Sequence, residues 1–185
     1  MGREIRMVIP NWDHPKYTAE NCRNYHHIGR YMPMFNRPYI QAITQWIVDH
    51  NSWELGTHPD IKEDPSRKKE YPHFAMWARN PPNIDYYRPN WNPEEMTWFQ
   101  VYETVSEGTP VTPPFATKEE LVDYLVENGD FWDQKRRAEG NSIMDCRPWP
   151  RSQAEKFVVV GWAPSMVGTS QGIVSGVQAL DIFTP

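Results

Sequence analysis

Leucine is scarce in this chain, which holds only four leucines beside nine Trp, nine Tyr, seven Phe and eighteen Pro among its 185 residues. Leucine is normally among the commonest residues, and it fills the interior of most helical bundles. Its scarcity argues against a leucine-based bundle and predicts a core built from aromatic rings. Buried indole and phenol groups need polar partners, so many rings are expected at the core margin, where they also suit a binding face.

Length and charge limit the function classes. The chain is expected to form one domain, residues 1–185, which can bury a core without metals or disulfides. A net charge of -5 disfavours binding to a phosphate backbone, so nucleic acid is not expected as a partner. Cys22 and Cys146 lie far apart and no secretory segment is recognisable, which predicts free thiols in the cytoplasm. No apolar run is long enough to span a membrane, and no cofactor fingerprint is present.

The first half of the chain predicts one strand and one long helix. Alternating apolar side chains over 5–9 predict a short strand, either half-buried or at a sheet edge. Turn-forming residues predict an ordered loop over 11–35. A helix is expected next, with Asn36 as its cap, Pro38 in its first turn and apolar residues at helical spacing up to His50.

Prolines interrupt residues 52–92, where no hydrophobic period is sustained. Short helices are expected over 64–71 and 74–78. A segment this long without recognisable helices or strands is unusual in a compact domain. It either has a function of its own or its assignment as irregular structure is wrong. Its many aromatic residues indicate that it packs onto other parts of the chain.

Two patterns in the middle of the chain are specific. Alternation over 98–107 predicts a strand with Glu103 on its apolar face. Thr117 and Glu120 have capping-box spacing, and Gly129 suits a left-handed stop, so a helix is expected between Thr117 and Gly129.

The last third of the chain leaves one element open. Ser152 and Glu155 have capping-box spacing and Gly161 suits a helix end, whereas the β-branched run over 156–162 also fits a strand. A β-hairpin is expected around 168–172. Together the patterns predict an α+β domain with a small, mainly antiparallel sheet, about three helices and long loops rich in aromatic residues and proline.

Glu103 is the first candidate for catalysis. A carboxylate on an apolar strand face has a raised pKa and can act as a general acid or base, although it can also simply pair with an arginine or a backbone group. Glu107 and His14 are its candidate partners. Ser165 and Ser175 lack the glycines that a nucleophile elbow requires.

The loop over 106–114 is the second candidate site. Its prolines hold a rigid shape between a strand and a helix, and Thr109 and Thr112 offer hydroxyl groups, which suits a small anion or a partner. It lacks the lysine and glycines of a phosphate-binding loop, so the sequence favours a stiff structural connection over a binding site.

Aromatic residues in irregular segments form a candidate interface, because Trp and Tyr are the usual anchors of protein interfaces. An unusually aromatic core is the competing explanation. The candidate binding residues are Trp12, Tyr86, Tyr87, Trp91, Tyr102, Thr109 and Thr112.

Metal and nucleic-acid signals are weak. Cys22 and His26 are four residues apart, but a structural zinc site needs four ligands and no second pair is matched, so no metal is expected. The basic runs 67–69 and 135–137 are most simply interpreted as solvated faces.

Several segments resemble a family of small uncharacterised proteins encoded by bacteriophages and prophages. The similar segments are "REIRMVIPNWDHP", "YYRPNW", "YETVSEGTPVTPPFATKEELVDYL", "GWAPSMV" and "VSGV". The family typically has "VPP" or "VPA" where this chain has Val8, Ile9 and Pro10. The resemblance implies a phage-related genomic setting and transfers no catalytic residue.

These observations favour a non-enzymatic phage accessory protein that binds a host or phage macromolecule, most simply a protein, with countering host defence as one role. One alternative is a small hydrolase or transferase of nucleotide or nucleic-acid metabolism that uses Glu103 and Glu107 with His14. Another is a virion or assembly component. The oligomeric state is left open.

Overall fold

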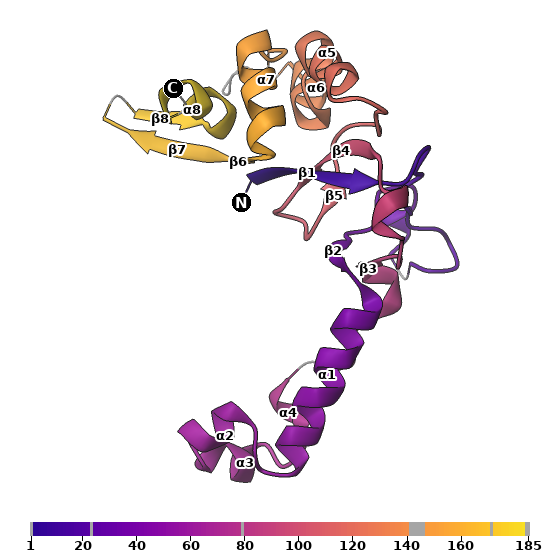
Figure 1. Ribbon diagram of the computed structural model, residues 1–185, viewed down its shortest axis with the longest axis vertical. Coiled ribbons are helices and arrows are strands. Elements are labelled where there is room, and N and C mark those ends of the chain that lie inside the picture. Colours follow the sequence, from indigo (N-terminus) through magenta and orange to yellow (C-terminus); the bar gives the residue numbers. More distant parts are fainter. Residues whose placement is uncertain (1, 23, 79, 141–146, 171, 184–185) are drawn as a thin grey trace. The chain divides into compact units, whose positions relative to one another are not determined.

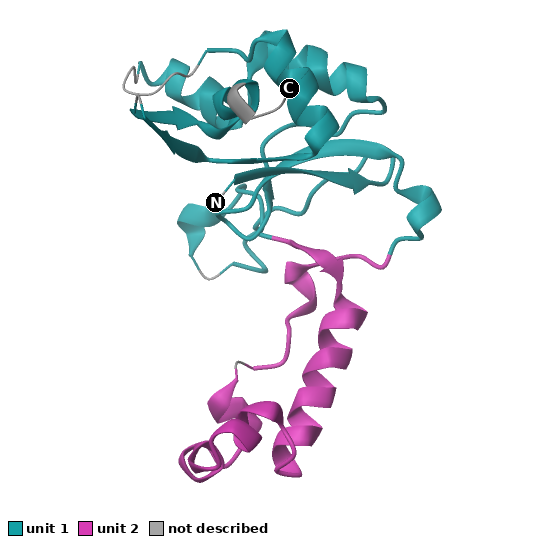
Figure 2. Cartoon of the chain, turned by 60° about the vertical axis from the view of Figure 1, so that its left-hand side comes forward, with its two compact units in different colours: residues 1–33, 91–185 teal, residues 34–90 magenta. Residues whose placement is uncertain are grey.

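A computed structural model describes residues 2–22, 24–78, 80–140, 147–170 and 172–183. The chain separates into two compact units, with residues 1–33 and 91–185 in unit 1 and residues 34–90 in unit 2 (Figure 2). Helices occur together with mainly antiparallel sheets, so the α+β class is confirmed. The expectation that residues 1–185 form one domain stays a prediction.

A four-stranded antiparallel sheet forms the base of unit 1. Its strands are β1 (Gly2–Val8), β4 (Trp98–Glu103), β5 (Thr109–Pro110) and β6 (Trp162–Pro164), in the order β5-β4-β1-β6. β1 pairs with β4 on one side and with β6 on the other. β6 reaches only Gly2–Glu4, with one more backbone hydrogen bond at Ile5, so among the described residues the rest of β1 pairs with β4 alone. The predicted strand is therefore an inner strand only at its start, and Arg6 beyond that point is nevertheless buried.

Four helices of unit 1 lie on one side of this sheet (Figure 1). They are α5 (Lys118–Asn128), α6 (Phe131–Ala138), α7 (Arg151–Val160) and α8 (Gly176–Phe183). Their apolar faces and Val101 of β4 form the main core, to which Leu121, Leu125 and Phe157 contribute fully buried side chains. The core thus uses three of the four leucines, Leu180 being the third, and completes its volume with valine, alanine and aromatic residues.

Local capping signals were correct for α5 and incomplete for α7. Thr117 and Glu120 form the expected capping box, and Gly129 ends α5 with a φ of 68°. Residues 151–160 are helical, so the strand alternative is wrong, and Gly161 ends α7 in the left-handed conformation. Ser152 does not cap this helix, because the helix already begins at Arg151, after Pro150.

The expected hairpin is present, and short elements fill the remaining loops of unit 1. β7 (Met166–Thr169) and β8 (Gly172–Ser175) pair antiparallel. Short 3₁₀ helices occupy Tyr25–His27 and Pro93–Glu95.

Gly176, at the start of α8, provides a test of this packing. A Cβ atom at Gly176 would lie 1.6 Å from the carbonyl oxygen of Pro164, whereas one at Gly168 would meet nothing within 4 Å. Because strand pairing holds the backbone of Pro164, we expect Gly176→Ala to lower the free energy of unfolding by about 2 kcal/mol, measured by urea denaturation. Gly168→Ala is the matched control, and equal effects of the two substitutions would contradict this packing.

Unit 2 consists of one long helix and several short elements. α1 (Tyr39–Glu54) is followed by α2 (Pro59–Glu63), α3 (Ser66–Glu70), α4 (Phe74–Trp77) and a 3₁₀ turn over Ile84–Tyr86. β2 (Phe35–Pro38) and β3 (Tyr87–Arg88) form a parallel pair. Asn36 therefore lies in a strand and does not cap α1, which starts after Pro38. The short helices here raise the helix number above the three or so expected.

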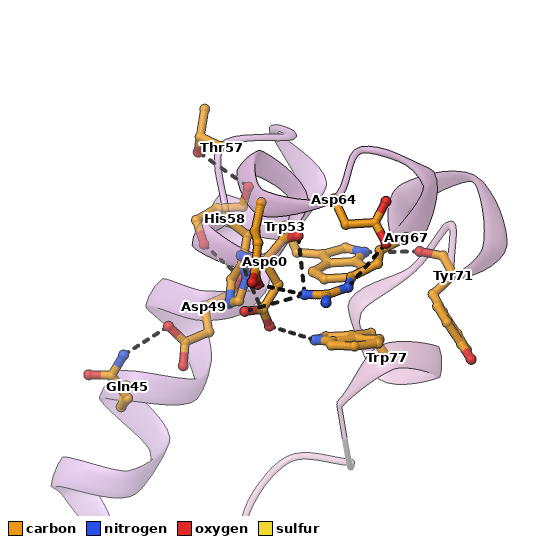
Figure 3. Close-up of polar contacts among 12 residues, drawn as sticks. Gln45, Asp49, Trp53, Thr57, His58, Asp60, Asp64, Arg67, Tyr71 and Trp77 are labelled. Atoms are coloured by element: carbon orange, nitrogen blue, oxygen red, sulfur yellow. Dashed lines mark hydrogen bonds and ion pairs between the residues drawn. The ribbon is translucent and has the colours of Figure 1, made fainter.

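An aromatic cluster forms the core of unit 2 (Figure 3). Trp53 is fully buried, stacks on Trp77 with ring centroids 5.4 Å apart, and donates its indole N–H to the carbonyl of Tyr71 at 3.0 Å. The guanidinium of Arg67 lies 5.3 Å from the Trp77 ring and forms ion pairs with carboxylates of α2. The basic run 67–69 is thus not only a solvated face, because Arg67 packs against this core.

Candidate functional site

A pocket of about 500 Å³ opens in unit 1, where the start of β1 and the end of β4 meet α6, α7 and α8. Its lining combines two indoles, Trp132 and Trp149, with exposed apolar side chains of Val105 and Met166. The charged residues of the lining are Arg3, Glu103, Asp133, Arg136 and Arg147. Small-ligand sites have this size and this mixture of apolar walls and few polar groups, which makes the pocket the candidate site.

Glu103 enters this pocket from the last position of β4. One carboxylate oxygen accepts the indole N–H of Trp132 at 2.6 Å. The other lies 2.9 Å from the hydroxyl of Ser106 and 3.0 Å from that of Thr109, and these two hydroxyls also hydrogen-bond to each other at 2.6 Å. The indole and this hydroxyl pair therefore hold Glu103 in one orientation, and the loop residue Thr109 acts by positioning it.

A pair of aspartates anchors α6 beside Glu103. Asp130 caps α6 and forms a reciprocal capping box with Asp133, and Arg3 of β1 forms an ion pair with the buried Asp130. Asp133 accepts the indole N–H of Trp149 and an N–H of Arg136, each at 2.8 Å. Burial, together with the charge of Asp130, raises the pKa of the Asp133 carboxyl. This network fixes one wall of the pocket.

A second polar cluster surrounds His14, which is 3 % exposed. Nε2 of His14 lies 2.7 Å from the carbonyl oxygen of Met32 and so carries the hydrogen, while Nδ1 lies 3.2 Å from the Tyr102 hydroxyl. That hydroxyl accepts the indole N–H of Trp12 and donates to Gln100. Burial lowers the pKa of His14 to about 4, so the ring is neutral at pH 7.

The structure does not bring the three candidate catalytic residues together. Successive side chains of β4 point to opposite faces, so Tyr102, which contacts His14, and Glu103 lie on opposite sides of the sheet. Glu107 is exposed in the turn after β4, with a φ of 61°, and the pocket lining does not include it. Only Glu103 of this set lies in the pocket.

The candidate binding residues of unit 1 make packing contacts and hydrogen bonds within the protein itself. Trp12 and Trp91 pack edge to face with ring centroids 4.6 Å apart, on the same side of the sheet as Tyr102. The hydroxyl of Thr112 accepts the backbone N–H of Val101 at 3.1 Å, which ties the loop to β4. The loop over 106–114 thus serves as a stiff connection whose residue Thr109 supports Glu103.

Tyr86 and Tyr87 belong to unit 2. Tyr87 pairs with Phe35 across the two short strands, and the two rings lie 5.1 Å apart. The guanidinium of Arg37 lies 5.5 Å from the Tyr87 ring. Tyr87 therefore packs within unit 2 at the start of α1.

Sequence reasoning missed most of the pocket lining. The run 135–137 was interpreted as a solvated face, yet Arg136 lines the pocket and its side chain is only 23 % exposed. The spacing of Asp130 and Asp133 is that of a capping box and could have located α6. No local pattern marks the other lining residues discussed above, which are Trp132 of α6 itself, Arg3 and Trp149.

Metal binding and membrane crossing each require features that the described residues lack. No group of three or more His, Cys, Asp or Glu side chains placed to hold a metal ion occurs among them. The thiol of Cys22 donates to the carbonyl of Asn24, and Cys146 lies outside the described residues. None of the described helices has the length and hydropathy needed to cross a membrane.

Comparisons with known proteins add no assignment: no protein-family model matches the chain, and neither a curated protein nor a solved structure is significantly similar to it. The candidate site therefore rests on its geometry.

Proposed function

We propose that this protein is a non-enzymatic binding protein that holds a segment of a partner protein in the pocket of unit 1. The observation that carries the proposal is a preformed pocket with two indole walls and carboxylates that are already bonded within the protein. Buried indoles and arginines are the residue types that dominate interface energetics. A pocket of about 500 Å³ also has the size of typical ligand sites, so it suits a short segment of a larger partner.

The partner is proposed to be a host or phage protein, in keeping with the family resemblance, and countering host defence is one role that fits. The hydrolase or transferase alternative is less well supported, because His14 and Glu103 lie on opposite sides of the sheet and Glu107 does not line the pocket. A virion or assembly role would require self-association or presence in particles.

Affinity capture with pocket variants tests the proposal. Tagged protein is incubated with lysates of infected and uninfected cells, and the captured proteins are identified by mass spectrometry. We expect one partner whose retention falls at least about tenfold with Trp132→Ala, since truncated hot-spot residues cost about 2 kcal/mol or more. Met166→Gln, at a side chain that is 52 % exposed, should weaken retention without disturbing the fold.

The matched control is Trp162→Ala, which removes an indole that is 48 % exposed in β6 and does not line the pocket. Circular dichroism checks that each variant is folded. A partner that all three variants retain equally would refute the pocket as the binding site. Absence of any enriched partner would refute the binding function and return attention to the enzyme and assembly alternatives.

A further inference from the structure

The carboxylates that line the pocket have little remaining capacity to accept hydrogen bonds. Glu103 is contacted by the indole N–H of Trp132 and by the mutually bonded hydroxyls of Ser106 and Thr109. Asp133 accepts three hydrogen bonds, because the backbone N–H of Asp130 at 3.1 Å joins the contacts from Trp149 and Arg136. A carboxylate has about four lone-pair positions, so these two groups are nearly saturated by the protein itself.

Two arginines that line the pocket, Arg3 and Arg136, have N–H donors left over. A guanidinium carries five N–H groups. The contact of Arg3 with Asp130 uses its Nε, and that of Arg136 with Asp133 uses one terminal nitrogen. The Nε of Arg136 is buried and has no hydrogen-bond partner among the described residues. Because Asp130 and Asp133 form one capping box, both guanidinium groups lie beside the same acidic pair.

Resting on the proposed function, we propose that the pocket selects its partner segment by a carboxylate, which the guanidinium groups of Arg3 and Arg136 bind. Guanidinium and carboxylate match in geometry and form short, charge-assisted hydrogen bonds. The indoles of Trp132 and Trp149 form apolar walls beside these donors, which suits an apolar side chain close to the carboxylate.

The charge balance of the pocket favours a singly charged ligand. The described lining contains three arginines together with Glu103 and Asp133, and Asp130 pairs with Arg3 beside it, so the formal charges of these described groups cancel when all are ionised. Because the described lining carries no excess of positive charge, a ligand of low negative charge suits the pocket better than a doubly charged one. A phosphate group of charge near -2 would add repulsion from Glu103.

Small probes test this selection on the full-length protein. N-acetylphenylalanine presents a terminal carboxylate, N-acetylglutamate α-amide presents a side-chain carboxylate, and N-acetylphenylalanine amide carries no charge. Phenyl phosphate serves as the doubly charged probe. Binding is followed by NMR through the indole N–H signals of Trp132 and Trp149. We expect one or both carboxylates to bind at least about tenfold more tightly than the amide, since hydrogen bonds to charged groups are the stronger ones.

Variants of neighbouring arginines supply the control. Arg136→Gln should weaken carboxylate binding about tenfold and leave amide binding unchanged. Arg137→Gln should change neither, because Arg137 donates to the carbonyl of Asn128 and does not line the pocket. Thermal unfolding of each variant verifies that Arg136→Gln is folded. Equal binding of amide and carboxylate, tighter binding of phenyl phosphate, or equal effects of the two variants would overturn the proposal.

Capture of the partner separates this proposal from the proposed function. A partner whose retention depends on Trp132 and Met166 but not on Arg136 would keep the binding function and reject carboxylate selection. Retention that depends on none of the pocket residues would reject both the binding function and carboxylate selection. Retention that falls with Arg136→Gln and is unchanged with Arg137→Gln would support both.

Discussion

Replacing Trp53 with alanine is expected to remove most of the stability of unit 2. The side chain is fully buried, stacks on Trp77 and donates to the carbonyl of Tyr71. Truncation of a buried tryptophan leaves a large cavity and costs about 3–5 kcal/mol. Native-state hydrogen exchange measures the free energy of opening separately for each helix and strand. We expect this free energy to fall by about 3–5 kcal/mol for the amides of α1.

The control for Trp53→Ala lies two residues further along the chain. Leu55 is 77 % exposed, so Leu55→Ala should change the free energy of opening by less than about 0.5 kcal/mol. Unchanged exchange protection of α1 in the Trp53 variant would show that the aromatic cluster does not hold unit 2 together.

Acidification is expected to destabilise unit 1 through His14. The pKa of this ring is lowered from 6.5 to about 4, chiefly by burial, so the unfolded chain takes up a proton at a higher pH than the folded protein does. The stability that the neutral ring contributes is complete above pH 6.5 and is lost as the pH falls toward 4. The loss amounts to about 2 kcal/mol at pH 5 and about 3 kcal/mol at pH 4.

Urea denaturation at a series of pH values measures this effect against His14→Gln. Glutamine retains an N–H donor for the carbonyl of Met32 but cannot titrate in this range. The difference between the two stability curves therefore isolates His14 from the carboxyl groups, including Asp133, whose raised pKa acts in the opposite direction. Parallel curves over pH 4–7 would show that His14 is not held in its neutral form.

Local signals predicted helix boundaries where neighbouring residues complete the hydrogen bonds, whereas the strand expected over 98–107 ends at Glu103. Thr117 and Glu120 satisfy each other within one turn, and Gly129 needs only its own backbone freedom. The same logic failed for Asn36, because Phe35 pairs with the distant Tyr87 and draws the segment into a strand. A cap signal therefore holds only where no long-range pairing competes with it.

By itself, the sequence determined the α+β class, the period of β4 that places Glu103 on the apolar face, and the ends of α5, since each depends on residues a few positions apart. Tertiary structure alone decided the pocket. Arg3 meets Asp130 across 127 positions, and Glu103 meets Trp132 across 29. It also separated His14 from Glu103, because side chains alternate between faces and the loop that carries His14 packs on the face opposite the helices. Such contacts between residues distant in sequence follow from how the helices and strands pack, and no periodic pattern in the sequence predicts them.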